Sequence, residues 1–464
     1  MVKNGDMVWG VPIRSSHHHI SEKILNDMRM EGDTLADAAL EAFFERYPQL
    51  QSCQADGFVT ALKLETKVYN SLPGYEEEKK AQDPRISKFM ASVLSVPEWL
   101  DYDMLIDGQA TFLAYSTSSM MGLLYYSLIG GFSAPKIISV LDATGYLSRS
   151  GLDATYRRLN ETFDMVLDCL EEDNALKPEA RGFYSVLKVR LLHARVRYRI
   201  LKAKKATKSS ENLQGTDWDS STNRIKVGWD VQENGVPINQ EDMMGTLLSF
   251  STNVLETIEK IGSPFLTRRE KEAYLHLWRY IGYLIGVKEE INPCTSIERA
   301  QGAVESVVLH LLHPNERSKI LANNVIRAVS YRAPTDFSPQ LHAQLARGLL
   351  GVELSNALEI GGEEDLWVSL YAWWIFFSLR LIALFLPFVV HRKSFKGKRA
   401  LDRVRSRLRY VVDASLGRGS AKSILTNSKN KGEGRKEAEK SPQCPFGFTA
   451  SDSIPAPHPL PAAS

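Results

Sequence analysis

Residues 182–201 read GFYSVLKVRLLHARVRYRIL, a stretch without proline. Its core-facing positions follow one another at spacings of three and four residues, in the order Val186, Val189, His193, Val196 and Ile200. Because an α-helix turns once every 3.6 residues, this spacing places all five on one face. The stretch therefore predicts a long helix whose apolar stripe includes a histidine.

The same helical period runs through most of the chain. Apolar residues recur at three and four in six further segments: Ile20–Tyr47, Thr155–Leu170, Glu241–Ile261, Arg269–Val287, Ser296–His313 and Pro339–Leu358. Residues Lys204–Asn223 are polar and are predicted to form a surface loop. A short ribbon is predicted near Ile225–Val231, and no other stretch shows the two-residue alternation of a strand. The sequence therefore predicts an all-α fold, with one large helical domain over residues 1–365.

Composition and charge narrow the class of protein. The chain has 464 residues, 44% of them hydrophobic, and four cysteines far apart, so a disulfide-stapled miniprotein and a structural zinc site are excluded. Residues 392–440 hold 16 Lys or Arg against 5 Asp or Glu, and the total charge is +2, which leaves −9 on the rest. An acidic body argues against nucleic acid as a partner. The basic end, residues 392–464, is predicted to be a largely disordered tail.

The segment before this tail is long and apolar. Residues 366–390 contain one charge, Arg380, and three tryptophans near their start, and basic residues follow at once. These features are typical of a membrane-associated segment, which we expect over 366–391, with membrane lipid as a partner. The first 30 residues hold no apolar signal-like run, so the domain is expected to face the cytosol. That orientation favours a re-entrant or in-plane segment over a full span; a buried helix of the domain is the alternative.

Two polar clusters are interpreted as solvated. Asp164, Asp168 and Glu172 share one face of a predicted helix, and an exposed acidic face explains them. The run His17–His19 lacks an acid or cysteine beside it to complete a metal site, so a solvated N-terminal arm is expected.

His193 is the residue with the most specific chemical setting. Arg190 and Arg197 lie near its face of the helix, three residues before it and four after it. Burying these cationic groups together requires anions. A haem would meet this need, since its iron takes a neutral imidazole and its propionates pair with guanidinium groups. A hydrogen-bonded core histidine is the alternative. On another helix, Arg158 and Thr162 share a face and could orient oxygen or an anion, although a surface arginine beside an ordinary threonine is the simpler interpretation of the pair.

An ordered series of short motifs resembles one family of haem oxygenases. The motifs are Gly130-Gly-Phe, Thr144-Gly-Tyr-Leu, Arg158-x-x-x-Thr162, Val189-Arg-Leu-Leu-His193-Ala-x-Val-Arg197, Trp229-Asp, Gly235-x-Pro-Ile-Asn-Gln-Glu-Asp-Met, Trp278-Arg-Tyr-Ile-Gly-Tyr-Leu-Ile-Gly286, Pro334 and Gly348-Leu-Leu-Gly351. Over residues 96–358 they are similar to the domain shared by fungal ER-bound MpaB-type oxygenases and bacterial latex clearing protein (rubber oxygenase).

The resemblance implies a b-type haem enclosed by the helical domain, with dioxygen as co-substrate. It implies His193 as the proximal iron ligand, with Arg190 and Arg197 beside the haem, and Arg158 and Thr162 in the distal pocket. Two positions depart from the rubber oxygenases: Glu161 stands where they have a lysine, and a distal carboxylate base has no secure counterpart, Asp142 being the nearest candidate.

The function expected from this resemblance is oxidation or cleavage of a C=C bond in a small apolar, isoprenoid-like substrate. The setting implied is a fungal-type secondary metabolite pathway at the endoplasmic reticulum membrane. Two alternatives stay open: a non-catalytic haem- or lipid-binding membrane protein, and a haem enzyme that hydroxylates or desaturates. The role of His276 is also open between a second axial ligand and a packed helix residue.

Overall fold

Helix α10 (Arg181–Thr207) forms where residues 182–201 predict a helix and continues past them. Its buried face carries Phe183, Leu187, Leu191 and Ala194, each at or near zero exposure. The computed structural model describes residues 5–14, 17–51, 56–70, 83–144, 151–207, 217–219, 224–226, 229–263, 266–332, 335–361, 365–389 and 395–418.

The elements of the described residues follow one another in this order along the chain. Before α10 come β1 (Met7–Val8), β2 (Val11–Pro12), α1 (Glu22–Arg29), α2 (Thr34–Arg46), η1 (Pro48–Gln51), α3 (Asp56–Asn70), α5 (Pro84–Leu94), α6 (Tyr102–Ala114), α7 (Ser116–Met121), the π-helix η2 (Gly122–Ile129), α8 (Pro135–Ala143) and α9 (Leu152–Leu170). After it come β3 (Asp217–Asp219), β4 (Arg224–Lys226), α11 (Val231–Asn234), α12 (Gln240–Phe250), α13 (Thr252–Ile261), α14 (Arg268–Ile285), η3 (Glu289–Ile291), η4 (Pro293–Thr295), α15 (Ile297–His310), α16 (Glu316–Val329), α17 (Pro339–Leu350), α18 (Val352–Ala357), α19 (Leu366–Val389) and α20 (Phe395–Ser415).

The prediction of an all-α fold is confirmed. The strands of the described residues form two short antiparallel ribbons, β1 with β2 and β3 with β4. The ribbon predicted near Ile225 is present as β4, but its partner β3 comes from the segment that was predicted as a polar loop. That segment also supplies the last turn of α10, through Thr207.

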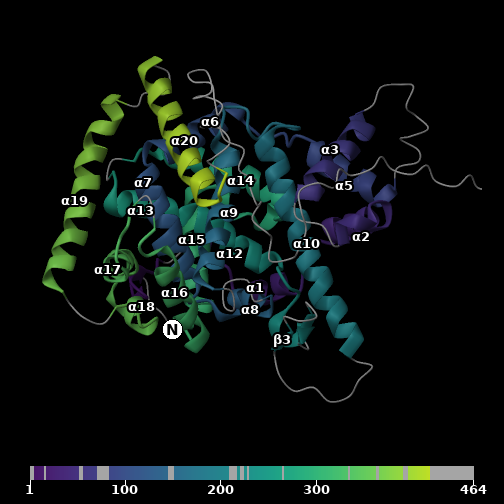
Figure 1. Ribbon diagram of the computed structural model, residues 1–464, viewed down its shortest axis with the longest axis horizontal. Coiled ribbons are helices and arrows are strands. Elements are labelled where there is room, and N and C mark those ends of the chain that lie inside the picture. The colour runs from purple at the N-terminus through teal and green to yellow at the C-terminus, as the bar shows by residue number, and fades with distance from the viewer. Residues whose placement is uncertain are drawn as a thin grey trace, which may run out of the picture.

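Helix α10 separates two groups of helices. Figure 1 shows α2, α3 and α5 on one side of it and α9, α12 and α14 on the other. The closest pairing beyond it is α6 with α14, where Gly108 lies against the backbone of Ala273 and the side chain of Leu277, so that a Cβ at this position would overlap both. Most buried apolar side chains of these helices form one continuous core.

The C-terminal tail departs from its prediction. Residues 395–415 form helix α20, which packs on α9, so the prediction of disorder over 392–464 is wrong for this part; residues 419–464 lie outside the described residues. Arg409 donates to Asp164 at 2.6 Å and to Asp168 at 2.8 Å, and Arg418 donates to Asp164 at 2.7 Å. The carboxylates of α9 hold α20 through contacts some 240 residues apart in sequence, which a local pattern does not reveal.

The interpretation of that acidic face changes accordingly. Asp164 and Asp168 are 8% and 6% exposed, so they are not solvated as predicted, whereas Glu172 is exposed. Asp168 also accepts a hydrogen bond from Ser185 of α10 at 2.8 Å. Buried carboxylates need such partners because an unpaired buried charge is strongly unfavourable.

The N-terminal arm is also packed rather than solvated. His19 Nε2 lies 2.7 Å from Glu305 Oε2, and Glu305 is buried on α15. Gly302 on the same helix allows the backbone of His18 to approach closely, where a Cβ would overlap it. The prediction of a solvated arm is therefore wrong for His18 and His19. Across the described ranges, no three His, Cys, Asp or Glu side chains are grouped to hold a metal ion.

A buried histidine in the smaller core makes stability depend on pH. Tyr125 of η2 lies with its hydroxyl 2.7 Å from Nδ1 of His342, which is 3% exposed, and burial lowers the pKa of His342 to about 4. This folded-state pKa is below the unfolded value of about 6.5, so the stabilisation is present above pH 6.5 and is lost as the pH falls toward 4.

His342→Gln should reduce this dependence. Between pH 6.5 and 4.5 the free energy of unfolding of the unmodified protein should fall by roughly 2 kcal/mol more than that of the variant. Urea unfolding at both pH values measures the difference. Equal losses in the two proteins would show that His342 does not titrate in this range.

Helix α19 coincides with the predicted membrane segment. Its stretch Leu366–Phe385 is long and apolar enough to cross a membrane by length and composition, with a mean hydropathy of 1.7. Only 11% of the most apolar part of this stretch is buried inside the protein, which contradicts the alternative of a buried helix of the domain. The basic residues 391–394 that follow it lie outside the described residues.

Candidate functional site

His193 lies on the less buried side of α10. Val189, Leu192, His193 and Val196 are all partly buried, at spacings that make one apolar face of the helix. The Nδ1 atom of His193 has no exposed surface and no hydrogen-bond partner within the described residues. Such an orphaned polar atom is unfavourable in a folded protein and is a common sign of an absent ligand or ion.

The electrostatic setting keeps this imidazole neutral. Burial first, and then the guanidinium of Arg197, lower the pKa of His193 to about 4, while the carboxylate of Asp33 acts in the opposite direction. At neutral pH the ring therefore carries no charge and retains a free nitrogen lone pair. This is the form of histidine that binds metals.

Arg190, one turn before His193, is held by an aspartate. Its Nε donates to Asp33 Oδ2 at 2.7 Å, its Nη2 to Asp33 Oδ1 at 3.1 Å, and its Nη1 to the carbonyl of Leu284 at 3.3 Å. The two side chains are 8% and 5% exposed, so this is a buried bidentate ion pair. Asp33 also caps α2 by accepting from the N–H of Ala36.

A glycine permits this arrangement. Gly286 ends α14 in the left-handed conformation, with φ of +97°, and a Cβ at this position would overlap the carboxylate of Asp33 and the Nε of Arg190. The end of α14 can therefore close over the ion pair only with glycine there.

Arg197, one turn after His193, has a similar partner and one unused donor. Its Nε donates to Asp37 at 2.7 Å and its Nη1 to the carbonyl of Ile238 at 3.1 Å. The residue is 1% exposed, and its Nη2 has no partner in the described part of the chain. Burial raises the pKa of Asp37, although Arg197 opposes this. One buried donor thus remains for a further anion.

The sequence reasoning missed Asp33 and Asp37. It required anions beside the two arginines, and the structure supplies two from α2, so the arginines do not depend on an added anion for their charge balance. The two aspartates are four residues apart, whereas the arginines that they pair with are seven apart, so no shared spacing in the sequence indicates that α2 and α10 lie side by side.

The other predicted site residues lie on α9. Arg158 is partly buried, and Thr162 is exposed and donates from its hydroxyl to the carbonyl of Arg158 at 3.1 Å. Glu161 forms a surface ion pair with Arg157 at 3.1 Å. Asp142 is in α8, and its side chain lies outside the described residues. The structure therefore groups His193 with Arg190 and Arg197, and it places Arg158 and Thr162 on the neighbouring helix α9.

His276 is accounted for by packing. Its Nε2 accepts the backbone N–H of Asp101 at 3.0 Å, and its ring meets Trp99 edge-on at 5.6 Å. It is 8% exposed, and burial, followed by the nearby Arg279, lowers its pKa. The interpretation as a packed helix residue is confirmed, and this nitrogen is not free to ligate iron.

Comparison with protein families matches residues 115–379 to the catalytic domain of the ER-bound oxygenase mpaB/B′ and rubber oxygenase family. The match covers more than half of the chain, from the end of α6 into α19. The chain belongs to this family. The resemblance noted from the motifs is thereby confirmed, although α2 with Asp33 and Asp37 precedes the matched residues.

Two individual proteins are similar to this chain. The rubber oxygenase of Streptomyces sp. (strain K30) is 26% identical over 278 residues, which is 60% of this chain and 58% of that protein. The structure of latex clearing protein in its closed state superposes with a TM-score of 0.53 at 19% identity, covering 89% of this chain and 95% of the other. The second comparison supports the fold. The match to the rubber oxygenase spans only 58% of the length of that protein.

Proposed function

We propose that this chain is a haem-dependent oxygenase in which His193 is the proximal ligand of a b-type haem enclosed by the helical domain. The observation that carries the proposal is the neutral imidazole of His193, whose Nδ1 is buried and has no hydrogen-bond partner within the described residues. Membership of an oxygenase family supports the reaction class.

The surroundings of His193 fit such a group. The apolar side chains of Val189, Leu192 and Val196 are only partly covered by protein atoms and offer contacts for a flat apolar ring. The unused Nη2 of Arg197 is suited to a propionate, while Arg190 is already held by Asp33 and Leu284. We therefore assign the propionate contact to Arg197, with Arg190 fixing the helix beside the ligand.

These contacts suggest what each group in the proposed site contributes to the reaction. Haem, when bound, supplies the chemistry of dioxygen binding and activation. His193 remains unprotonated above its pKa of about 4 and keeps its lone pair available. The apolar face of α10 excludes water. Arg158 and Thr162 supply a cation and a hydroxyl to orient oxygen or the substrate.

We propose a small apolar, isoprenoid-like molecule as the substrate, oxidised or cleaved at a C=C bond to carbonyl products. The names of the relatives, as rubber oxygenase and ER-bound oxygenase, support this class of substrate and a place at the endoplasmic reticulum membrane. A fungal-type biosynthetic pathway and a cytosolic orientation belong to the same proposal. The acidic body of the chain argues against a nucleic-acid partner.

The proposed reaction predicts oxygen-dependent formation of carbonyl products from an isoprenoid chain by the haem-loaded protein. Arg158→Ala should lower kcat by about tenfold or more with haem content unchanged, because it removes a positive group from the oxygen side. Arg157→Ala is the matched control, because Arg157 is the exposed arginine next to Arg158 in sequence and forms a surface ion pair with Glu161. Product formation by mass spectrometry and haem content by absorbance are measured together. Equal activity in the Arg158 variant and the control would remove Arg158 from the site.

A further inference from the structure

Helix α19 presents a broad apolar face to the outside of the molecule. Of the 20 large apolar side chains that are exposed in the described part of the chain, 11 lie on this helix. They are Leu366, Trp367, Leu370, Tyr371, Trp373, Trp374, Phe377, Leu381, Ile382, Leu384 and Phe385. A contiguous apolar surface of this size is unusual on a protein that meets only water and marks an interaction surface.

The opposite face of α19 is attached to the domain. Phe376 packs against Gly348 of α17, where a Cβ would lie 2.5 Å from its ring, and Ala372 and Ala383 are 3% and 2% exposed. The side chains in contact with the two cores recur at helical spacing: Val368, Ala372, Ile375, Phe376, Leu379 and Ala383. Figure 1 shows α19 lying along the flank of the molecule beside α13 and α17.

Arg380 also belongs to this attachment. Its Nη2 donates to the carbonyl oxygen of Lys260 at 2.6 Å. Lys260 lies in the last turn of α13, where unpaired carbonyls and the helix dipole attract a cation. The one charge of the apolar segment is therefore used to fasten α19 to the domain.

This attachment is incompatible with a membrane span. From Val368 to Ala383 the attached face is about 22 Å long at 1.5 Å per residue, most of the ~30 Å hydrocarbon core. If α19 crossed a bilayer in this position, α13 would enter the hydrocarbon with it. That helix carries Lys260 and Glu256, which would be unfavourable there. Only the outer face of α19 is available to lipid.

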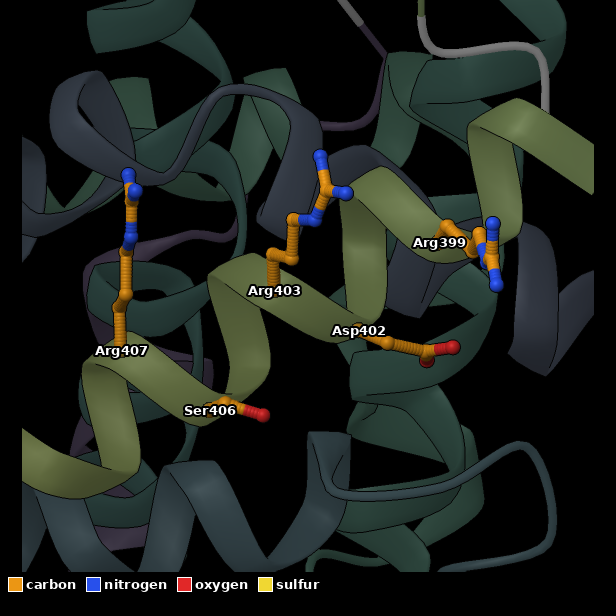
Figure 2. Close-up of a pocket in the computed structure, with 5 residues that line it drawn as sticks. All are labelled: Arg399, Asp402, Arg403, Ser406 and Arg407. Atoms are coloured by element: carbon orange, nitrogen blue, oxygen red, sulfur yellow. The ribbon is translucent and has the colours of Figure 1, made fainter.

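The outer face of α20 adds positive charge next to α19. Arg399, Arg403 and Arg407 recur at four-residue spacing on its exposed side and, with Asp402 and Ser406, line a shallow depression. Figure 2 shows these five side chains along successive turns of α20. The helix contacts α19, and Arg409 fastens its other face to α9.

We propose that α19 and α20 form a docking surface for an anionic lipid bilayer, with α19 lying in the plane of the interface and not across it. Tryptophan, tyrosine and phenylalanine on the outer face of α19 suit the boundary between headgroups and acyl chains. The arginines of α20 suit anionic headgroups. This inference deepens the proposed membrane attachment, and it does not require haem to be bound.

The first test is sedimentation of the full chain with vesicles of phosphatidylcholine alone or with phosphatidylserine added. Binding should be stronger to the anionic vesicles. The substitutions Trp373→Ser and Trp374→Ser together should lower binding to both kinds of vesicle. Arg399→Glu, Arg403→Glu and Arg407→Glu together should remove the preference for anionic vesicles, at about fivefold in affinity for each arginine lost.

Matched controls change the same residue types elsewhere. Ile24→Ser and Ile320→Ser remove exposed apolar side chains from α1 and α16, and Arg268→Glu with Arg269→Glu reverses two exposed charges on α14. None of these should alter vesicle binding. Circular dichroism of every variant verifies its helix content. Equal loss of binding in controls and test variants, or self-association of the full chain in place of vesicle binding, would overturn the proposal.

The second test distinguishes the in-plane position from a span. One chain carries Asp365→Cys, before α19, together with Cys53→Ser and Cys444→Ser. A second chain keeps Cys444, which follows α19 by 55 residues in sequence, and carries only Cys53→Ser; the remaining Cys169 and Cys294 are buried. Protein is added to sealed vesicles and treated with a membrane-impermeant maleimide. Labelling at both positions is expected. Labelling at one position and protection at the other would show that α19 crosses the bilayer. A protein that docks but binds no haem would leave this inference intact while contradicting the proposed function.

Discussion

His193→Ala is expected to remove the Soret absorption of haem from the purified protein. The imidazole is the proposed axial ligand, and its loss should weaken haem binding by at least about tenfold, since even partners of a ligand contribute 10–100-fold to metal affinity. The fold should persist, because α10 keeps its fully buried face of Phe183, Leu187, Leu191 and Ala194. Absorbance per chain after haem reconstitution measures the effect.

Two comparisons make this result specific. Added imidazole should restore part of the Soret band in His193→Ala by filling the space that the side chain leaves. His276→Gln should keep full absorbance, since glutamine can still accept the N–H of Asp101. An unchanged spectrum in His193→Ala would assign the ligand to another residue.

Asp33→Asn should give the largest loss of stability among single changes near the site. Arg190 would remain buried without its counter-charge, which is unfavourable by about 3–5 kcal/mol. Asparagine keeps the helix cap of α2, so the substitution isolates the charge. Urea unfolding of the haem-free protein measures the change.

An exposed ion pair provides the control for Asp33→Asn. Asp27 pairs with Lys23 on α1, with side chains 68% and 87% exposed, and Asp27→Asn should change stability by less than about 1 kcal/mol. Combining Asp33→Asn with Arg190→Met should recover much of the loss, because no buried charge is left unpaired. A loss as small as that of the control would mean that the buried pair contributes little.

The helices were predictable because, within each segment, the apolar residues recur at the spacing of a helical turn. The stretch around His193 predicts α10, which forms there. His193 was found for the same reason, since its place in an apolar stripe is a local property. Asn239, followed three residues later by Asp242, predicts a helix cap, and it caps α12 by a reciprocal pair of side-chain and backbone hydrogen bonds. The same pattern at Thr34 and Asp37 predicts a cap at Thr34, but Asp33 caps α2 instead.

The missed features depend on contacts between distant segments. The sequence of helix α20 alone suggests a basic tail, because the hydrogen bonds of Arg409 to Asp164 and Asp168 that hold it on α9 are seen only in the structure. Likewise, the residues near Arg190 in sequence do not predict that Asp33, 157 residues away, is its partner. Arg29 with Glu241 is a further buried pair of this kind, joining α1 to α12. Charge pairs of this type follow from tertiary packing and have no signature in a single segment.

The most direct measurement is titration of the haem-free full chain with haem, followed by its visible absorption. Saturation at about one haem per chain, with a Soret band that His193→Ala lacks, is expected if His193 is the ligand of an oxygenase haem. A chain that gives no Soret band at saturating haem, while its circular dichroism indicates an intact helical fold, would contradict haem-dependent chemistry at this site.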